Sequence, residues 1–377
     1  MYDRRIVYAD NAASSFPKPQ CVIRAVVNSL KRNAANPGRS GHVLSVDAAR
    51  TVYEARCAAG EFFDCDENGI IFTQNATHAL NILIMGALCP GNHVLISDME
   101  HNSVLRPLTA LKQRGTVTFD VVSTDGDYVL GFERAIRPNT RMIICTHASN
   151  VTGRLFDVAR IASVAKRRGV LFAVDASQSA GYADLRMRRD HIDFLCTAGH
   201  KGLLAPQGSG ILAINCEVPV SPLTYGGTGT ESLSALQPPT LPEALEAGTL
   251  CTPAIAGLKA ALGYLMHSHS ELQARERRLI GGFIDGLSQI DGVRIYEPAA
   301  ERVPTVSFNL KGYDSEQVAS MLDRSGICVR GGWHCSALAH GALGTAGVGA
   351  VRVSFGPFNT EADARRILKC IRDIKKI

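Results

Sequence analysis

Two stretches predict the fold class of this chain: Val170-Leu-Phe-Ala-Val-Asp175-Ala-Ser-Gln178 and Ile192-Asp-Phe-Leu-Cys-Thr197-Ala-Gly199-His200-Lys201. Each contains an apolar run rich in Val, Ile and Phe, which is typical of a strand buried in a parallel sheet. Each ends in polar residues, where such a strand would emerge into a loop. Because ligands of open α/β sheets bind outside these carboxyl ends, we expect Asp175 and Lys201 to reach one edge of the sheet.

An acid and a lysine at one sheet edge are the groups that pyridoxal phosphate requires. The lysine attaches the cofactor as a Schiff base, and the carboxylate keeps the pyridine nitrogen protonated so that the ring accepts electrons. Two ordinary roles remain open for the same residues. An Asp after a strand is commonly a helix cap, and a Lys after a Gly is commonly a solvated surface charge.

The composition is that of an ordinary globular protein, large enough for two domains. The chain has 377 residues, of which 46% are hydrophobic and 20% are charged, and its formal net charge is +5. The basic residues form only short local clusters, so we do not expect nucleic-acid binding. No run reaches the ~18 apolar residues of a membrane span, and the first residues do not read as a signal peptide, so we expect no membrane association or secretion.

Eleven cysteines are spread along the chain without a C-x-x-C pair. This spacing argues against a metal site built on zinc and against a disulfide framework. We expect most of the cysteines to be buried small hydrophobic residues in a reducing cytosol. The expected location is therefore cytoplasmic.

Strands and helices alternate through the first 214 residues, which predicts an α/β domain with a mostly parallel sheet. Polar clusters follow several strands, among them 98–103 and 147–153. After the strand Gly69-Ile-Ile-Phe72, the chain opens through Asn75-Ala-Thr77 into a helix, whose free amides would favour a phosphate. A simple helix cap by Asn75 or Thr77 explains this pattern equally well.

A Gly-, Pro- and Thr-rich segment between Pro219 and Pro253 separates this region from a second unit. Loops of this length are usually functional or cover an interface. A long helical region then leads into short strands and helices that predict a smaller α+β domain. We expect a large domain over 15–255 and a small domain formed by 1–14 and 256–377.

Two further features lie in the small domain. Arg330-Gly-Gly-Trp-His-Cys335 is a flexible, electropositive loop of the kind that favours a thiolate, although a buried, inert thiol is the commoner fate of a cysteine. Arg352 interrupts an apolar strand and needs a partner, because an unpaired buried guanidinium is costly. It could hold a substrate carboxylate through two parallel hydrogen bonds, and a structural salt bridge would explain it equally well.

These motifs together resemble the class V aminotransferase family of fold-type-I pyridoxal phosphate proteins. The match runs from Tyr8-Ala-Asp-Asn11 to Phe358-Asn-Thr360. Within the family, Arg330-Gly-Gly-Trp-His-Cys335 resembles the R-x-G-x-x-C motif of the cysteine desulfurase and selenocysteine lyase branch, on its short-loop (SufS-like) side. The order and spacing of Asp175-x-x-Gln178, Gly199-His200-Lys201 and this motif are highly specific, whereas no single piece is.

For the cofactor, the resemblance implies that Lys201 carries pyridoxal phosphate covalently and that Asp175 pairs with its pyridine nitrogen. His101 would stack on the ring and take part in catalysis, while Gln178 would hydrogen-bond the phenolic oxygen. The phosphate would be held by the Ala76 amide, Thr77, His200 and, from the second subunit of a homodimer, Thr249.

For the substrate, the resemblance implies that Asn150 and Arg352 hold the amino-acid carboxylate. Arg330 would lie nearby, His42 would line the pocket, and Cys335 would accept sulfur and pass it to an acceptor protein.

Two positions depart from the family pattern. Ala198 stands where relatives usually carry a phosphate-binding Ser, so that contact is missing or is supplied by Thr197. Trp333 stands where many desulfurases have a second His, which leaves open the proton donor near the substrate sulfur.

The implied activity is conversion of L-cysteine to L-alanine, with transfer of the sulfur to Cys335 as a persulfide. A selenocysteine lyase or a cysteine/cystine C–S lyase would use the same cofactor on a related substrate. From other classes, a thiol hydrolase pairing Cys335 with His334 or His340, or a non-catalytic scaffold, would hold no cofactor.

Overall fold

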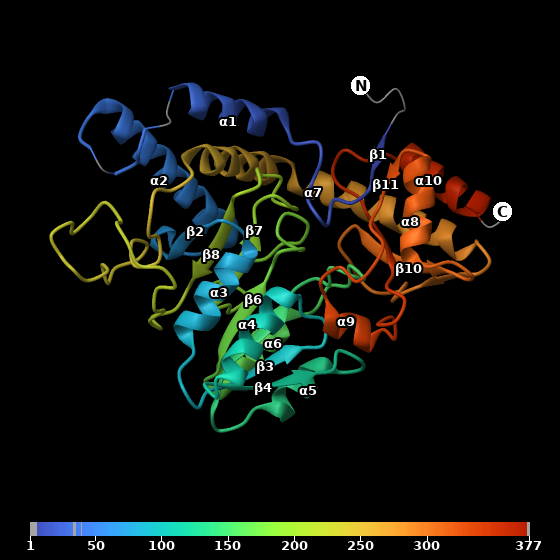
Figure 1. The fold of residues 1–377 in the computed structure, drawn as a ribbon, viewed down its shortest axis with the longest axis horizontal. Helices are drawn as coiled ribbons and strands as arrows, with labels where there is room; N and C mark the ends of the chain where they lie inside the picture. The colour runs from blue at the N-terminus through green and yellow to red at the C-terminus, as the bar shows by residue number, and fades with distance from the viewer. Residues whose placement is uncertain (1–5, 33–34, 39, 375–377) are drawn as a thin grey trace.

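The computed structural model describes residues 6–32, 35–38 and 40–374, so the ends of the expected small domain, 1–5 and 375–377, lie outside the described residues. A larger body carries the main sheet, and a smaller body beside it holds the first strand together with the C-terminal elements (Figure 1). The long helix α7 (Thr252–Ser288) runs along both bodies.

The larger body is built on a seven-stranded sheet. Its strands, in spatial order, are β2 (Ile70–Thr73), β8 (Gly210–Ile214), β7 (Phe194–Ala198), β6 (Leu171–Asp175), β5 (Thr140–Thr146), β3 (His93–Ser97) and β4 (Thr118–Val122). From β7 to β4 all neighbours are parallel, whereas β8 is antiparallel to both β2 and β7. The mostly parallel α/β sheet predicted from the sequence is confirmed.

Helices cover both faces of this sheet. The larger body contains α1 (Gln20–Arg32), α2 (Val43–Phe63), α3 (Ala76–Ala87), α4 (Asn102–Gln113), α5 (Tyr128–Ala135) and α6 (Val158–Arg168), together with the first half of α7 and a 3₁₀ turn at Glu67–Gly69. Along β6, Phe172 and Val174 enter the core shared with α2, α6 and α7, whereas Ala173 enters the core shared with α3 and α4. This alternation is the period of two of a pleated strand covered on both sides.

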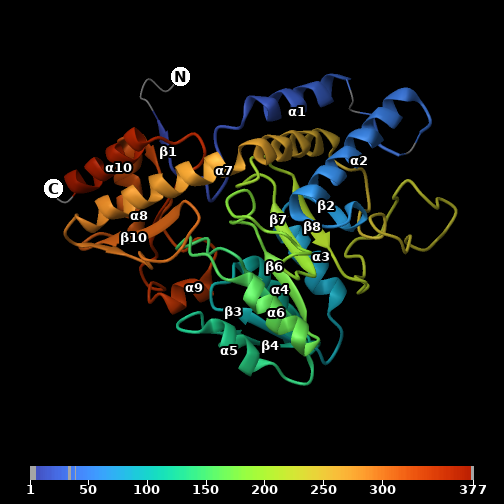
Figure 2. The same cartoon turned by 180° about the vertical axis from the view of Figure 1, so that it is seen from behind.

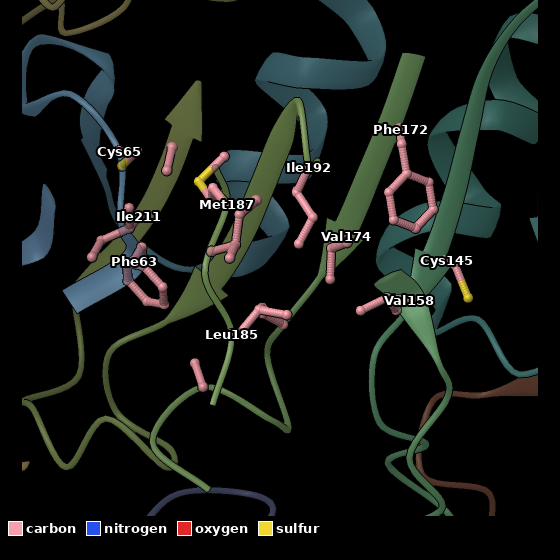
Figure 3. Packing of buried hydrophobic residues seen from close by; sticks show 14 of the residues in the cluster. Phe63, Cys65, Cys145, Val158, Phe172, Val174, Leu185, Met187, Ile192 and Ile211 are labelled. Carbon is pink, nitrogen blue, oxygen red and sulfur yellow. The ribbon is translucent and has the colours of Figure 1, made fainter. Parts of the chain in front are cut away.

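Figure 3 shows the first of these cores, in which Phe172 and Val174 lie near Val158 of α6. The Phe172 side chain is fully buried. Burial of a side chain of this size contributes about 1.5–3 kcal/mol. The packed strands thereby give the loops at their carboxyl ends a rigid base.

The smaller body contains the antiparallel strands β9 (Val293–Ile295), β10 (Thr305–Leu310) and β12 (Val351–Ser354), with β10 in the middle. The first strand, β1 (Val7–Tyr8), pairs in parallel with β11 (Ile327–Cys328). The helices are α8 (Ser315–Arg324), α9 (Ala337–Ala342) and α10 (Glu361–Ile374). Because α7 packs its first half against the large core and its second half against the small one, the boundary after residue 255 stays a prediction.

The Gly- and Pro-rich segment after β8 projects away from the larger body, beyond α2, in both views (Figures 1 and 2). Residues 217–250 form turns and bends without a helix or strand, and Tyr225, Leu233 and Leu236 are exposed there.

The cysteines do not behave as the sequence predicted. All eleven are free, but only Cys65, Cys145 and Cys196 are buried, whereas Cys21, Cys89, Cys251 and Cys335 are exposed. The expectation that most are buried is wrong, because many lie on loops or on outward-facing positions of helices. In the described part of the chain, no helix combines the length and apolar character needed to cross a membrane.

Candidate active site

One cavity lies at the carboxyl ends of β5, β6 and β7, where parallel strands deliver their last residues to the same edge. Asp175 ends β6, and Lys201 follows β7 by three residues. The cavity is lined by Asn75, Ala76, Thr77, His101, Ser103, Thr146, Asn150, Asp175, Ser177, Gln178, Ala198, His200 and Lys201. The expectation that Asp175 and Lys201 reach one edge of the sheet is confirmed.

Lys201 lies on a tight loop closed by backbone hydrogen bonds. Its carbonyl accepts from Leu204 N at 2.9 Å, and Ala205 N donates to Gly199 O at 2.8 Å. Desolvation in the cavity lowers the pKa of Lys201 to about 8, while the charge of Asp175 acts in the opposite direction. The amine therefore loses its proton far more easily than a surface lysine does.

Asp175 is almost fully buried, and one of its oxygens is already held. Oδ1 accepts from Ser177 N at 2.9 Å and from the Ser177 hydroxyl. Within the described chain, no hydrogen bond to Asp175 Oδ2 is found. The carboxylate is thus oriented by its own loop and keeps one oxygen for a partner in the cavity.

The start of α3 has both a capping side chain and free backbone amides, the two interpretations that the sequence left open. Asn75 caps the helix, because its Oδ1 accepts from His78 N at 2.9 Å. The amides of Ala76 and Thr77 have no acceptor among the described residues, as expected for the first turn of a helix. Free amides at the positive end of a helix are suited to an anion.

Two histidines face the same cavity in the uncharged state. Desolvation and the charge of Lys201 lower the pKa of both His101 and His200 to about 4. His101 Nδ1 lies 2.8 Å from Ser103 Oγ, whose partner is Thr77 Oγ1 at 2.8 Å. His200 Nδ1 is buried and has no partner in the described chain, so it can bind a further group beside the α3 amides.

The Cys335 loop approaches this cavity from the smaller body. Cys335 O accepts from Asn102 N at 2.9 Å, directly after His101. Asn150, which lines the cavity, binds His334 O and Ser336 Oγ, the residues on either side of Cys335. The loop that carries Cys335 is therefore bound to the wall of the cavity that contains Lys201, although the two residues lie far apart in the sequence.

Arg352, on β12, forms the structural salt bridge that was one of the two roles left open by the sequence. Its Nη2 donates to Asp10 Oδ1 at 2.8 Å, which is a structural salt bridge, and its Nη1 donates to Asn150 O at 3.0 Å. Its Nε is buried without a partner in the described chain. Since two of the five N–H donors of the guanidinium are used, three remain for other acceptors, and the role in holding a substrate carboxylate stays a prediction.

Comparison with known proteins now adds to this geometry. The profile described as aminotransferase class V matches residues 7–367. The chain belongs to the class V aminotransferase family. It is 34% identical to a probable cysteine desulfurase from Methanothermobacter thermautotrophicus, over 98% of this chain and 94% of the relative, and 30% identical to one from Pyrococcus abyssi, over 99% and 95%.

A solved structure gives the same result for the fold. The apo structure of a cysteine desulfurase from Thermococcus onnurineus NA1 superposes with a TM-score of 0.92 at 29% identity and covers 98% of this chain and 95% of that one. The resemblance stated from the motifs and the fold-type-I architecture are confirmed. Members of the class V aminotransferase family depend on pyridoxal phosphate.

Several residues that the resemblance named lie outside the cavity of this class V aminotransferase chain. Thr249 lies in a separate cavity beside the projecting segment, where its Oγ1 accepts from Asn36 Nδ2 at 3.3 Å. His42 caps α2 and accepts from Ser45 N at 3.3 Å. The Thr197 hydroxyl donates to Ala176 O at 3.3 Å, and Arg330 pairs its backbone with that of Arg352.

The histidines next to the thiol have other partners. His334 Nε2 lies 3.0 Å from Ala350 O, and His340 Nδ1 lies 2.7 Å from Thr345 Oγ1. No hydrogen bond from either ring to Cys335 is present among the described residues. This arrangement gives no support to a Cys–His hydrolase.

Sequence reasoning missed several residues around the site. Lys18 Nζ donates to His200 O at 2.9 Å, and Glu100 accepts from Thr146 N at 2.7 Å beneath the cavity. Ser103 and Glu100 lie in the polar cluster that follows β3. The sequence therefore indicated that this segment lies near the site, but it did not predict the hydrogen-bond partners of the two residues. Asp10, the partner of Arg352, lies in the first motif of the resemblance but had no role assigned to it.

Proposed function

We propose that this class V aminotransferase is a pyridoxal phosphate-dependent cysteine desulfurase. It converts L-cysteine to L-alanine and retains the sulfur on Cys335 as a persulfide. The observation that supports the proposal most is that Lys201 and Asp175 share one cavity with Asn150, whose amide binds the loop on both sides of Cys335. The relatives named probable cysteine desulfurase support it, since they match nearly the whole chain.

The residues of the cavity fit pyridoxal phosphate. Lys201 would attach it, Asp175 Oδ2 would face its pyridine nitrogen, and the uncharged ring of His101 would stack on it. Gln178 Nε2 donates to Ala12 O at 3.0 Å and has a second hydrogen for the phenolic oxygen. The phosphate would be held by the free amides of Ala76 and Thr77, the Thr77 hydroxyl and His200. When bound, the cofactor supplies an electron sink that stabilises negative charge at the substrate Cα.

The chain's own groups carry out the remaining chemistry. Lys201, with a pKa of about 8, is suited to take the Cα proton and return it. Arg352 and Asn150 would hold the substrate carboxylate. The Cys335 thiol loses its proton and bonds through sulfur to the substrate sulfur as the carbon–sulfur bond breaks. The electron pair of that bond takes up a proton at Cβ, which balances the proton lost by Cys335, and the products are alanine and the Cys335 persulfide. Trp333 does not act as the proton donor, because its Nε1 already donates to Ala346 O at 2.7 Å.

The same proposal includes a homodimer, a sulfur acceptor and a cytoplasmic location. Thr249 lies outside the Lys201 cavity of its own chain, and the segment that carries it projects from the body with exposed apolar side chains. A second subunit would cover that segment and receive Thr249 at its phosphate site. Exposed Cys335 could pass its sulfur to an acceptor protein, and eleven free thiols suit a reducing compartment.

Product analysis tests this function. The cofactor-loaded protein is given L-cysteine and a reductant, and alanine, pyruvate and sulfide are measured; L-selenocysteine is tested in parallel. We expect equal amounts of alanine and sulfide, and we expect Cys335→Ala to lose sulfide release while a pyridoxyl group can still be fixed on Lys201 by borohydride. Pyruvate and ammonia would instead indicate a C–S lyase, and activity with selenocysteine alone would indicate a selenocysteine lyase. A colourless protein without a pyridoxyl group would contradict the proposal.

A further inference from the structure

The backbone that carries Cys335 is held in an unfavourable conformation. His334 and Cys335 have φ values of 49° and 57°, so two consecutive residues with side chains lie in the left-handed region. Steric repulsion between Cβ and the backbone disfavours this region for such residues. A conformation of this kind persists only where surrounding groups hold it, so the contacts of the loop determine where the thiol lies.

A single side chain, Asn150, binds the loop on both sides of Cys335. Its Nδ2 donates to His334 O at 2.8 Å, and its Oδ1 accepts from Ser336 Oγ at 2.7 Å. Asn150, His334 and Ser336 are all buried. Because an amide nitrogen can only donate and an amide oxygen can only accept, these two bonds fix the orientation of the Asn150 amide as well as that of the loop.

The same amide faces the proposed substrate site. Asn150 lines the Lys201 cavity, and its backbone carbonyl accepts from Arg352 Nη1 at 3.0 Å. Since Nδ2 carries two hydrogens and His334 O takes one, the other is available for a substrate carboxylate. One side chain can therefore contact the substrate and the segment that carries the attacking thiol.

We propose that Ser336 is a positioning residue, which acts through the Asn150 amide to hold the Cys335 thiol in line with the bound substrate. The proposal rests on the function proposed above, because the thiol needs this position for sulfur transfer. Without the Ser336 hydroxyl, the amide loses one of the two bonds that fix it, and the strained loop can relax. Transfer of sulfur would then slow, while cofactor attachment and carboxylate binding would remain.

The rate at which iodoacetamide alkylates Cys335, followed by peptide mass spectrometry, measures the loop without any turnover. Exposed Cys21 is an internal reference. We expect Ser336→Ala to raise the Cys335 alkylation rate about five-fold or more, since a buried hydrogen bond of ordinary strength is lost. Ser336→Thr keeps the hydroxyl and should stay close to the wild-type rate. Ser307→Ala is the matched control, because it removes another fully buried serine hydroxyl, which donates to Val151 O at 2.6 Å, but has no bond to the loop.

The kinetic parameters provide a second readout. Ser336→Ala should lower kcat for L-cysteine about ten-fold with little change in KM, because an interaction that orients the thiol is lost while substrate binding is kept. A general loss of stability would lower the amount of active enzyme and would affect Ser307→Ala as well. If Ser336→Ala does not fold, Asn150→Asp is the alternative variant. It keeps the acceptor for Ser336 Oγ but cannot donate to His334 O. We expect it to raise the Cys335 alkylation rate as well.

The outcomes separate this inference from the proposed function. If alkylation in Ser336→Ala and Asn150→Asp equals that of the wild type, or if Ser307→Ala changes it equally, the positioning role is wrong even when the enzyme forms a persulfide. If the wild type forms no persulfide but both variants speed alkylation, the contact between Asn150 and the loop is upheld, and the proposed function and the role in sulfur transfer are wrong.

Discussion

At the scale of single residues, the pKa of Lys201 is central to the account. Burial lowers this pKa to about 8 from an ordinary value of 10.5, against the opposing influence of Asp175. Only the neutral amine can attack an aldehyde, so in the cofactor-free protein a larger fraction of Lys201 becomes reactive as the pH rises through about 8.

We therefore expect the rate of pyridoxal phosphate attachment to Lys201 to increase with pH, with a midpoint at about 8. Stopped-flow absorbance on the cofactor-free protein measures this rate. Asp175→Asn is the matched variant: removal of its charge should move the midpoint to lower pH, because the charge of Asp175 raises the pKa of Lys201. A midpoint near the ordinary lysine value in both proteins would contradict the role of desolvation.

At the scale of structural elements, the loop that follows β7 depends on close contact between two backbone segments. Gly181 has a φ of 88°, and a Cβ placed there would lie 2.1 Å from Gly202 O, next to Lys201. Neither backbone can yield easily, because both lie in turns closed by backbone hydrogen bonds, Ala183 N to Ser179 O and Leu204 N to Lys201 O. The spacing of these glycines is thus part of what places the Lys201 amine.

Gly181→Ala should therefore lower the free energy of unfolding by more than about 2 kcal/mol and slow cofactor attachment. Gly169→Ala is the control, since Gly169 also has a positive φ, 66°, but has nothing within 4 Å of the added Cβ. There we expect a loss of about 1 kcal/mol, from the backbone conformation alone. Urea unfolding measures the free energy of unfolding of both variants. Equal losses in the two would show that the close approach to Gly202 O adds nothing to the cost of the Gly181→Ala substitution.

Prediction from the sequence worked best where function depends on where strands end. The apolar runs that end at Asp175 and shortly before Lys201 predicted that both residues lie at one edge of the sheet. The reason is that the carboxyl ends of parallel strands all lie at the same edge. It failed where a side chain's partner comes from a distant segment. Nothing local to Asn150 or Ser336 shows that they bind each other, and Arg352 alone does not reveal Asp10 as its partner. The antiparallel direction of β8 could not be predicted either, because its short apolar run would fit a strand of either direction.

At the scale of the whole molecule, the proposed dimer makes a specific prediction about Thr249. The Lys201→Ala variant lacks a working active site in its own chain. The Thr249→Ala variant weakens the phosphate site of the subunit with which it pairs. If Thr249 acts in the second subunit, mixed dimers of the two variants contain one intact site. Random exchange of subunits should then restore about a quarter of wild-type activity at limiting cofactor. Activity that does not exceed that of the separate variants would contradict the exchange of Thr249 between subunits.

Sulfur transfer to Cys335 can be followed by the mass of the Cys335 peptide after a single turnover without reductant, together with the amount of alanine released. The account predicts one added sulfur atom on Cys335 for each alanine, and none on the exposed thiols Cys21, Cys89 and Cys251. Alanine formed without sulfur on Cys335, or sulfur found on another cysteine first, would contradict it.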